Sequence, residues 1–346
     1  MIHTQDSPYI KSIHYDNGDD FVKAISYEGE LYNTFNTQFI FRGHSTDSYE
    51  LLPSALRGIL SLDNNENIKT IENSASDDEK KIIRYLPSTE YIQILEEYKL
   101  LQEFFTVCDN NGLYVPHIES LRHSFYPLVD AEKILLESKW LPKDYWELAS
   151  LAQHHGVKTR FLDWTHDIYV ALYFATKGVF FDTKEDIDPK QFLLAYRRGE
   201  KYPPKHDMEI WALDKDVVLT CPQIPLRIVQ PRYNNNANLC AQKGIFTFWE
   251  SIKPGFDKEG KMDLKKKTDR RSLEIQLDCY LRETKAPVKP YLYRITIPQK
   301  AAFSIFAFIE KMGYNASTLF PGYDGVVKYM KEHNEIVIKN SDNKNE

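Results

Sequence analysis

The alternation of apolar and polar positions is most informative between Pro142 and Gly178. Pro142 suits the first position of a helix, and Gly156 supplies a stop, so the pattern predicts a helix over Pro142 to His155. One face of that helix would carry Tyr145, Leu148, Leu151 and Ala152. The short apolar run that follows, Thr159 to Trp164, has the length of a strand.

A second helix is predicted directly after this strand. Thr165 or Asp167 can cap its start, and Gly178 can close it. Its inner face would carry Ile168, Ala171, Leu172 and Ala175. The unit therefore reads as helix, tight turn, strand, cap and helix. The C-terminal end of its strand carries the polar and aromatic side chains Asp163, Trp164, Thr165 and His166.

Shorter patterns on either side predict a mixture of helices and strands. Before the unit we predict a strand over Gln38 to Gly43, a helix over Pro87 to Val107 and a helix within Ile118 to Leu136. After it, strands are predicted over 192–196, 209–213, 228–229, 244–249, 273–277 and 291–297. Helices over 301–311 and 317–332, an edge strand over 334–339 and a frayed tail complete the chain.

These elements predict one α+β domain, in which a small, mostly antiparallel mixed sheet is flanked by helices. The chain shows no internal repeat and no convincing linker. Residues 60–140 would form a helical insertion, within which Ser61 to Lys81 is rich in Asn, Asp, Glu and Ser and is expected to be weakly ordered. Residues 333–346 would form the terminal edge strand and tail.

Composition excludes several classes of protein. The 346 residues are 42% hydrophobic and carry a net charge of −6, which argues against a general nucleic-acid binder. Four cysteines lie far apart, so no disulfide framework or metal knuckle is indicated. The first residues lack the apolar core of a signal peptide, and no run approaches the roughly 20 apolar residues of a membrane span. We therefore expect a cytoplasmic protein with no membrane partner.

Standard catalytic and cofactor motifs are absent. The chain has neither Gly-x-x-x-x-Gly-Lys-Ser/Thr nor Gly-x-Gly-x-x-Gly, the two common nucleotide cradles. His154 and His155 are adjacent, so on a helix their side chains diverge by about 100° and do not share one metal ion without help. No metal site is predicted.

Two polar residues at strand positions call for an explanation. Asp163 lies between Leu162 and Trp164 in an apolar strand, where an unpaired buried charge is too costly. Arg42 and Arg160 are its candidate partners, either in a buried ion network or in a cleft that faces a substrate. Gln242 precedes the aromatic strand and is either a backbone cap or an amide at a site.

Several segments together resemble the FRG domain family. They are Phe41-Arg42-Gly43, Ala152 to Gly156, Thr159 to Thr165, Val170 to Ala175, Asn236 to Phe248 and Ser317 to Gly325. The resemblance runs from about residue 20 to 332. This chain departs at four positions, with Lys158 where Pro is usual, Phe161 where Leu is usual, and Gly322 and Tyr323 in place of Asp and Leu.

The order of these motifs is similar to that of folds of the ADP-ribosyltransferase type. That similarity implies that Arg42 holds the phosphates or ribose of NAD, and that Thr165 borders the nicotinamide end with Trp164 or Tyr169 for stacking. Gln242 would lie near the ribose 2′-hydroxyl, where those enzymes carry a Glu. A Gln supplies no negative charge, so Asp163 or Glu250 would have to substitute.

Two functions follow as hypotheses. In the first, the chain acts on NAD or a nucleotide-like substrate by ADP-ribosyl transfer or glycohydrolysis, with NAD as a substrate and no permanently bound cofactor. The catalytic residues would be Arg42, Asp163 and Gln242, and the substrate-binding residues would be His44, His155, Arg160, Trp164, Thr165 and Tyr169. In the second, the same cleft binds a nucleotide, a nucleic-acid end or a protein segment without chemistry.

A protein or nucleic-acid acceptor is a further hypothesis for the transferase reaction. By family association, so is a role in phage defence or as a toxin-like effector. The residues do not indicate an oligomeric state.

Overall fold

A mixed seven-stranded sheet runs through the part of the chain that the structure describes, in the order β1-β7-β4-β2-β3-β6-β5. The structure is a computed structural model that describes residues 7–57, 89–122, 140–182, 206–234, 236–251 and 269–334. The strands are β1 (Ile10–His14), β2 (Phe39–His44), β3 (Leu162–Thr165), β4 (Asp207–Asp214), β5 (Leu226–Val229), β6 (Gly244–Trp249) and β7 (Leu292–Pro298). Only the pairing of β1 with β7 is parallel among these strands. The predicted α+β class with a mostly antiparallel mixed sheet is confirmed.

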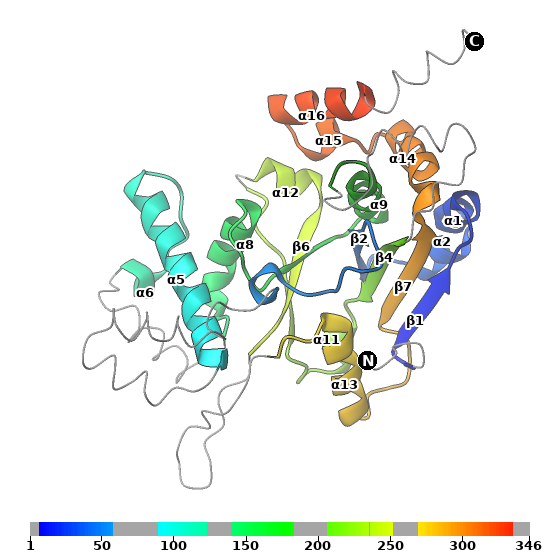
Figure 1. Ribbon diagram of the computed structural model, residues 1–346. Helices are drawn as coiled ribbons and strands as arrows, with labels where there is room; N and C mark the ends of the chain where they lie inside the picture. The colour runs from blue at the N-terminus through cyan, green and yellow to red at the C-terminus, as the bar shows by residue number, and fades with distance from the viewer. Residues whose placement is uncertain are drawn as a thin grey trace.

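One face of the sheet carries two large apolar cores and a smaller cluster around Phe41 and Ala212 (Figure 1). The first core packs under α1 (Gly18–Ile25), α9 (Ile168–Lys177) and α14 (Ala302–Lys311). The second packs under α5 (Thr89–Asn110) and α8 (Trp146–His154), against Phe246 and Phe248 of β6. Alternate residues of a strand point to the same face of the sheet. The even-numbered residues of β4 therefore face the first core, and those of β6 face the second. A cavity lies between these two cores.

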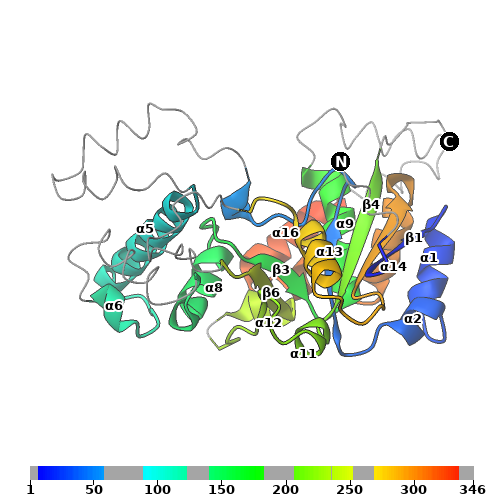
Figure 2. The same ribbon diagram turned by 90° about the horizontal axis from the view of Figure 1, so that it is seen from below.

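The opposite face of the sheet packs against α13 (Leu273–Glu283) and the short helix α11 (Val217–Thr220), which Figure 2 shows from below. Ile40, Leu162 and Trp164 point into this third core. The remaining short helices are α2 (Glu30–Thr34), α6 (Glu119–Arg122), α12 (Ala237–Ala241), α15 (Ala316–Leu319) and α16 (Tyr323–His333). No described helix has the length and apolar character needed to cross a bilayer.

The predicted helix-strand-helix unit is confirmed, with shifted boundaries. A 3-10 turn, Lys143–Tyr145, leads into α8, and Gly156 adopts a positive φ of +85° that ends it. The strand is shorter than the predicted Thr159 to Trp164, since only Leu162 onward pairs with β6. Asp167, rather than Thr165, caps α9 by accepting a hydrogen bond from the Tyr169 backbone N–H.

The predicted strand over 273–277 is wrong, because these residues form the first half of α13. Leu273, Leu277 and Leu281 repeat every fourth residue and are buried in the third core, which is a helical spacing. The apolar–polar alternation of Leu273 to Leu277 is too short to separate the two periods.

The predicted helix over 317–332 is divided into α15 and α16. Pro321 and Gly322 separate the two helices, and Gly322 has a φ of +117°. Asn315 begins α15 with a capping box that includes Thr318. The sequence pattern predicts no element before Gln38, yet β1, α1 and α2 all precede it.

Some predicted elements fall outside the described residues. They are the strand over 192–196, most of the insertion over 60–140 and, apart from Asn334, the edge strand over 334–339. Within the insertion, the predicted helix over Pro87 to Val107 is confirmed as α5, and α6 is the described part of the helix predicted within Ile118 to Leu136.

Candidate functional site

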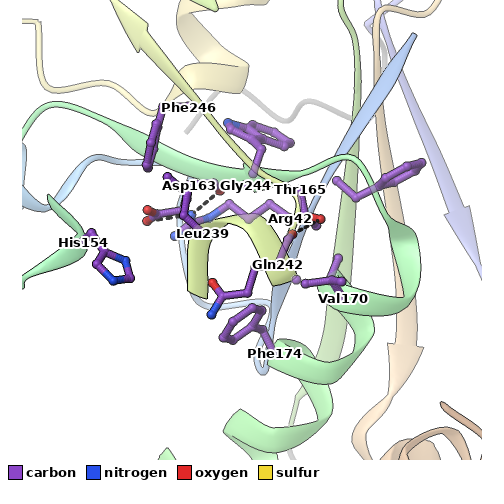
Figure 3. Close-up of a pocket in the computed structure, with 14 residues that line it drawn as sticks. Arg42, His154, Asp163, Thr165, Val170, Phe174, Leu239, Gln242, Gly244 and Phe246 are labelled. Atoms are coloured by element: carbon purple, nitrogen blue, oxygen red, sulfur yellow. Dashed lines mark hydrogen bonds and ion pairs between the residues drawn. The ribbon is translucent and has the colours of Figure 1, made fainter. Parts of the chain in front are cut away.

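A cavity of about 300 Å³ opens between the two cores on one face of the sheet. Its polar lining comes from Arg42, His154, Asp163, Thr165 and Gln242, and its aromatic lining from Phe41, Trp164, Phe174 and Phe246. Figure 3 shows these side chains converging from β2, β3, β6, α8, α9 and α12. We call this site the Arg42 cavity.

The Arg42 cavity exists because β2 and β3 separate after a single backbone pair, Phe41 with Thr165. Arg42 takes the place of the next contact between the strands, since its Nη1 donates a hydrogen bond of 2.7 Å to the carbonyl oxygen of Asp163. Gly43 lets α9 approach β2 closely here, because a Cβ at this position would lie 2.0 Å from the carbonyl oxygen of Ala171. One guanidinium thus bridges the opening from which the cavity is formed.

Arg42 and Asp163 form an ion pair across this opening, with Nη1 3.6 Å from Oδ2. The Arg42 side chain is 16% exposed, whereas that of Asp163 is 58% exposed. The expectation that Asp163 is buried is therefore wrong. It faces solvent at the cavity and also accepts a hydrogen bond of 3.1 Å from Gln153. Burial lowers the pKa of the Arg42 guanidinium, an effect that the negative charge of Asp163 opposes.

Thr165 and Gln242 meet at the other end of the cavity (Figure 3). The Thr165 hydroxyl donates a hydrogen bond of 2.8 Å to the backbone oxygen of Gln242 and accepts one of 3.0 Å from the Asp167 N–H. The Gln242 amide donates to the carbonyl oxygen of Leu319, at 3.1 Å. Both side chains line the cavity, and through these hydrogen bonds both also hold neighbouring backbone segments in place around it.

Trp164 of β3 lines the cavity, while its indole points into the third core on the other face of the sheet. Its ring is 3% exposed, and its Nε1 donates a hydrogen bond of 2.7 Å to Thr247 on the neighbouring strand β6. A buried indole whose N–H is already satisfied presents mainly apolar surface.

Comparison with known proteins bears on this arrangement. Residues 37–183 match the family model described as the FRG domain. The chain contains an FRG domain. No curated protein and no solved structure gives a significant match, so the ADP-ribosyltransferase type of fold has no structural support from relatives. The wider boundaries of 20 and 332 expected for the domain stay a prediction.

The FRG domain supplies β2, β3, α8 and α9, and with them Arg42, Asp163 and Thr165. Gln242 and Phe246 follow it in the chain, from α12 and β6. The Arg42 cavity is therefore completed by residues outside the matched segment.

Arg160 does not line the cavity, and it does not pair with Asp163. Its guanidinium forms a buried bidentate pair with Glu97 of α5, with hydrogen bonds of 2.7 and 2.9 Å. Trp140 donates a further hydrogen bond of 2.7 Å to the same carboxylate. The predicted network of Arg42, Arg160 and Asp163 is therefore two separate pairs. Arg160 thus attaches the helical block formed by α5 and α6 to the segment that leads into β3.

His155 and Tyr169 also lie away from the cavity. His155 stacks on Phe104, with ring centroids 6.4 Å apart, and borders a second, more open hollow of about 190 Å³. Tyr169 packs against Tyr314 and donates to the Ile25 carbonyl oxygen at 3.4 Å. His44 is next to the cavity but does not line it, because its ring lies behind Arg42. Glu250 pairs with Arg227, so it does not substitute for a Glu at position 242.

Sequence reasoning did not select His154, Phe174 or Phe246 as site residues, although all three line the cavity. His154 lies at the last position of α8, facing the opening, while Phe174 is partly buried on α9. The sequence did contain one signal for Phe174, because this large aromatic residue lies between the inner-face positions of α9. Which aromatic ring borders a cavity depends on the separation of β2 and β3, which no local pattern encodes.

Metal chemistry finds no support in the described ranges. They contain no group of three or more His, Cys, Asp or Glu side chains that could hold an ion. The four cysteines form no disulfide.

Proposed function

We propose that this FRG-domain protein binds NAD or a nucleotide-like substrate in the Arg42 cavity and acts on it by ADP-ribosyl transfer or glycohydrolysis. The observation that carries the proposal is the setting of Arg42. A guanidinium held at the mouth of a mainly aromatic cavity offers charge to a phosphate or ribose, and the rings behind it offer an apolar surface to a planar base.

The donors of Arg42 are only partly used within the protein. Nε and Nη1 each have a partner, whereas Nη2 has no hydrogen-bond acceptor within the described part of the chain. Guanidinium groups bind phosphate or carboxylate oxygens through such paired donors. Arg42 thus supports recognition of an anionic or oxygen-rich group.

Asp163 supports a chemical role because it is the one carboxylate among the described residues that line the cavity. Cleavage of the bond between C1′ of the ribose and the nicotinamide nitrogen leaves positive charge on the ribose. A nearby carboxylate stabilises that charge, and a water or acceptor oxygen then bonds to C1′ and loses its proton. We assign this stabilising role to Asp163 in place of Gln242.

The size of the site also supports a ligand with two parts. A volume of about 300 Å³ accommodates a ring and its sugar but not a whole dinucleotide. His154 lines both the Arg42 cavity and the adjoining hollow of Asn236 and Asn238. A dinucleotide would place its second half in this polar hollow.

The alternative is a binding module that leaves its ligand unchanged. The neutral amide of Gln242, already donating to Leu319, favours it. In that case the Arg42 cavity recognises a nucleotide, a nucleic-acid end or a protein segment through the same guanidinium and rings.

Calorimetric titration with NAD, together with chromatographic measurement of NAD and nicotinamide, tests the proposal. We expect Arg42→Ala to weaken NAD binding about 10- to 100-fold, which is the loss of one or two charge-assisted hydrogen bonds. Asp163→Asn should retain binding and lose turnover, because the amide keeps the shape without the charge. Arg122→Ala, on α6 in the helical block, is the matched control.

The outcomes separate the two functions. Wild-type protein that neither binds nor consumes NAD refutes the proposal. Protein that binds NAD through Arg42 but returns it unchanged, with Asp163→Asn behaving as wild type, establishes the binding module instead.

A further inference from the structure

His44, at the end of β2, has a tautomer that its contacts determine. The residue is 5% exposed, and its Nε2 lies 3.0 Å from Nε of Arg42. Arginine nitrogens only donate hydrogen bonds, so Nε2 must be the acceptor. The imidazole is then neutral and carries its proton on Nδ1. Burial and the neighbouring positive charges of Arg42 and Arg57 lower the pKa of His44 to about 3, in agreement with a neutral ring.

The protonated Nδ1 faces a carboxylate that is itself held in place. Glu209 of β4 is directly opposite His44 in the sheet, and its Oε2 lies 3.7 Å from Nδ1. This distance is too long for a hydrogen bond, yet a buried oxygen of Glu209 this close to the ring favours an N–H on that side. Glu209 is fully buried, pairs with Arg294 of β7 and accepts a hydrogen bond of 3.2 Å from Trp211.

These groups form a row across four strands. Positive or hydrogen-bond-donating atoms alternate along the row with negative or hydrogen-bond-accepting atoms. The row runs from Arg294 through Glu209, His44 and Arg42 to Asp163. Only its last two members line the Arg42 cavity. The other three, Arg294, Glu209 and His44, are not part of its lining.

We propose that His44 is a positioning residue for the cavity: as the Nδ1–H tautomer facing Glu209, it holds Nε of Arg42 and so directs the terminal nitrogens of Arg42 toward the ligand. The consequence for binding rests on the proposed function. A protonated His44 would place an N–H against the N–H of Arg42 and one positive charge against another, which would displace the guanidinium.

The first test measures His44 and Arg42 without a ligand. The ¹⁵N chemical shifts of the His44 ring should show protonated Nδ1 and unprotonated Nε2 at pH 7, and the Nε–H signal of Arg42 should be protected from exchange. A His44 ring protonated on Nε2 at pH 7, or an Arg42 Nε–H that exchanges as fast as that of exposed Arg232, overturns the proposal.

The second test uses two variants that each keep one half of the imidazole. His44→Gln places an amide oxygen near the Nε2 position and can still accept from Arg42. His44→Asn places its amide near the Nδ1 position and cannot reach Arg42. We expect NAD affinity within about threefold of wild type for His44→Gln and a loss of about 10- to 100-fold for His44→Asn.

A purely structural role for His44 predicts a different result, in which both variants lose affinity in proportion to their loss of melting temperature. Equal affinities for the two variants would also refute the proposal. If wild-type protein does not bind NAD, the proposed function fails. The His44→Asn variant then still decides the inference, because Arg42 Nε–H protection should be lost in it and retained in His44→Gln.

Discussion

At residue 44 a neutral imidazole lies between the guanidinium of Arg42 and the carboxylate of Glu209. The contact with Glu209 is not visible in the sequence around position 44, which resembles a turn after a strand. Arg42 is two residues away on the same side of β2, whereas Glu209 comes from β4. The environment of His44 is therefore produced by strand pairing.

The depressed pKa of His44 predicts a dependence of stability on pH. The unfolded chain takes up a proton on this residue near pH 6.5, and the folded protein does so only near pH 3. The free energy of unfolding should therefore fall as pH drops below 6.5, by up to about 1.4 kcal/mol per unit from this residue. Urea denaturation of wild-type protein and His44→Gln between pH 7 and 5 measures this contribution.

The comparison between the two proteins isolates His44. Burial raises the pKa of the facing Glu209 to about 7, which acts in the opposite direction as the pH falls. That contribution is present in both proteins, and the nearby Arg42 and Arg57 keep their charge throughout. The stability advantage of the wild type over His44→Gln should shrink with acid, and parallel curves would contradict the assigned pKa.

Individual contacts of charged residues were the least predictable part of the site. Arg42 and Asp163 could be paired from the sequence because both stand at strand ends next to a cavity-forming unit. Arg160 is three residues from Asp163, so proximity in the chain favours that pair as well. It binds Glu97 instead, 63 residues earlier, because α5 packs over the same end of the sheet.

Among the elements, β2 and α9 have the closest contact around the cavity, and it depends on Gly43. Added at this position, a Cβ would clash with the Ala171 backbone at 2.0 Å, and a helix backbone cannot move aside locally. The gap between β2 and β3 is therefore tied to the position of α9. Any shift of α9 would carry Val170 and Phe174 of the cavity wall with it.

We expect Gly43→Ala to destabilise the protein by about 2–4 kcal/mol, because the clash is with backbone. Gly112→Ala is the matched control. Gly112 has a φ of +69° with open space around it, so only the left-handed conformation is penalised, by about 1 kcal/mol. Guanidinium chloride denaturation measures both, and equal losses would show that β2 and α9 are not closely packed at Gly43.

Elements with local start and stop signals could be predicted from the sequence. The cap at Asp167, the apolar spacing of α9 and the short apolar run of β2 are properties of a few neighbouring residues. The region of α13 lacked such a signal, since its first five residues satisfy a strand pattern as well as a helical one. The separation of β2 from β3 results from packing across the whole sheet.

On the scale of the whole molecule, two cores share one face of the sheet and are joined by few long-range polar links. The buried pair of Glu97 and Arg160 links α5 to the segment that leads into β3, and its side chains are 4% and 5% exposed. Removing one partner leaves the other charge buried and uncompensated. Arg160 thus matters for assembly of the helical block.

Arg160→Met should lower the free energy of unfolding by about 3–5 kcal/mol. Below its melting temperature the variant should keep the NAD affinity of the wild type, because Arg160 does not line the Arg42 cavity. Arg232→Met, at a 75% exposed arginine that pairs with Glu147 at 3.6 Å, should change stability by less than about 1 kcal/mol. Differential scanning calorimetry and NAD titration of both variants check this expectation. A selective loss of NAD affinity in Arg160→Met would show that Arg160 takes part in NAD binding.

The single backbone pair between β2 and β3 has a mechanical consequence. A sheet normally connects neighbouring strands through a ladder of hydrogen-bonded pairs, but β2 and β3 are connected by one such pair and by the hydrogen bond from Arg42. The boundary between β2 and β3 is therefore able to bend, and Arg42 connects its two sides. A ligand that binds Arg42 and contacts both sides of the cavity would restrict this motion. Strands and helices that the ligand does not contact would then also become more rigid.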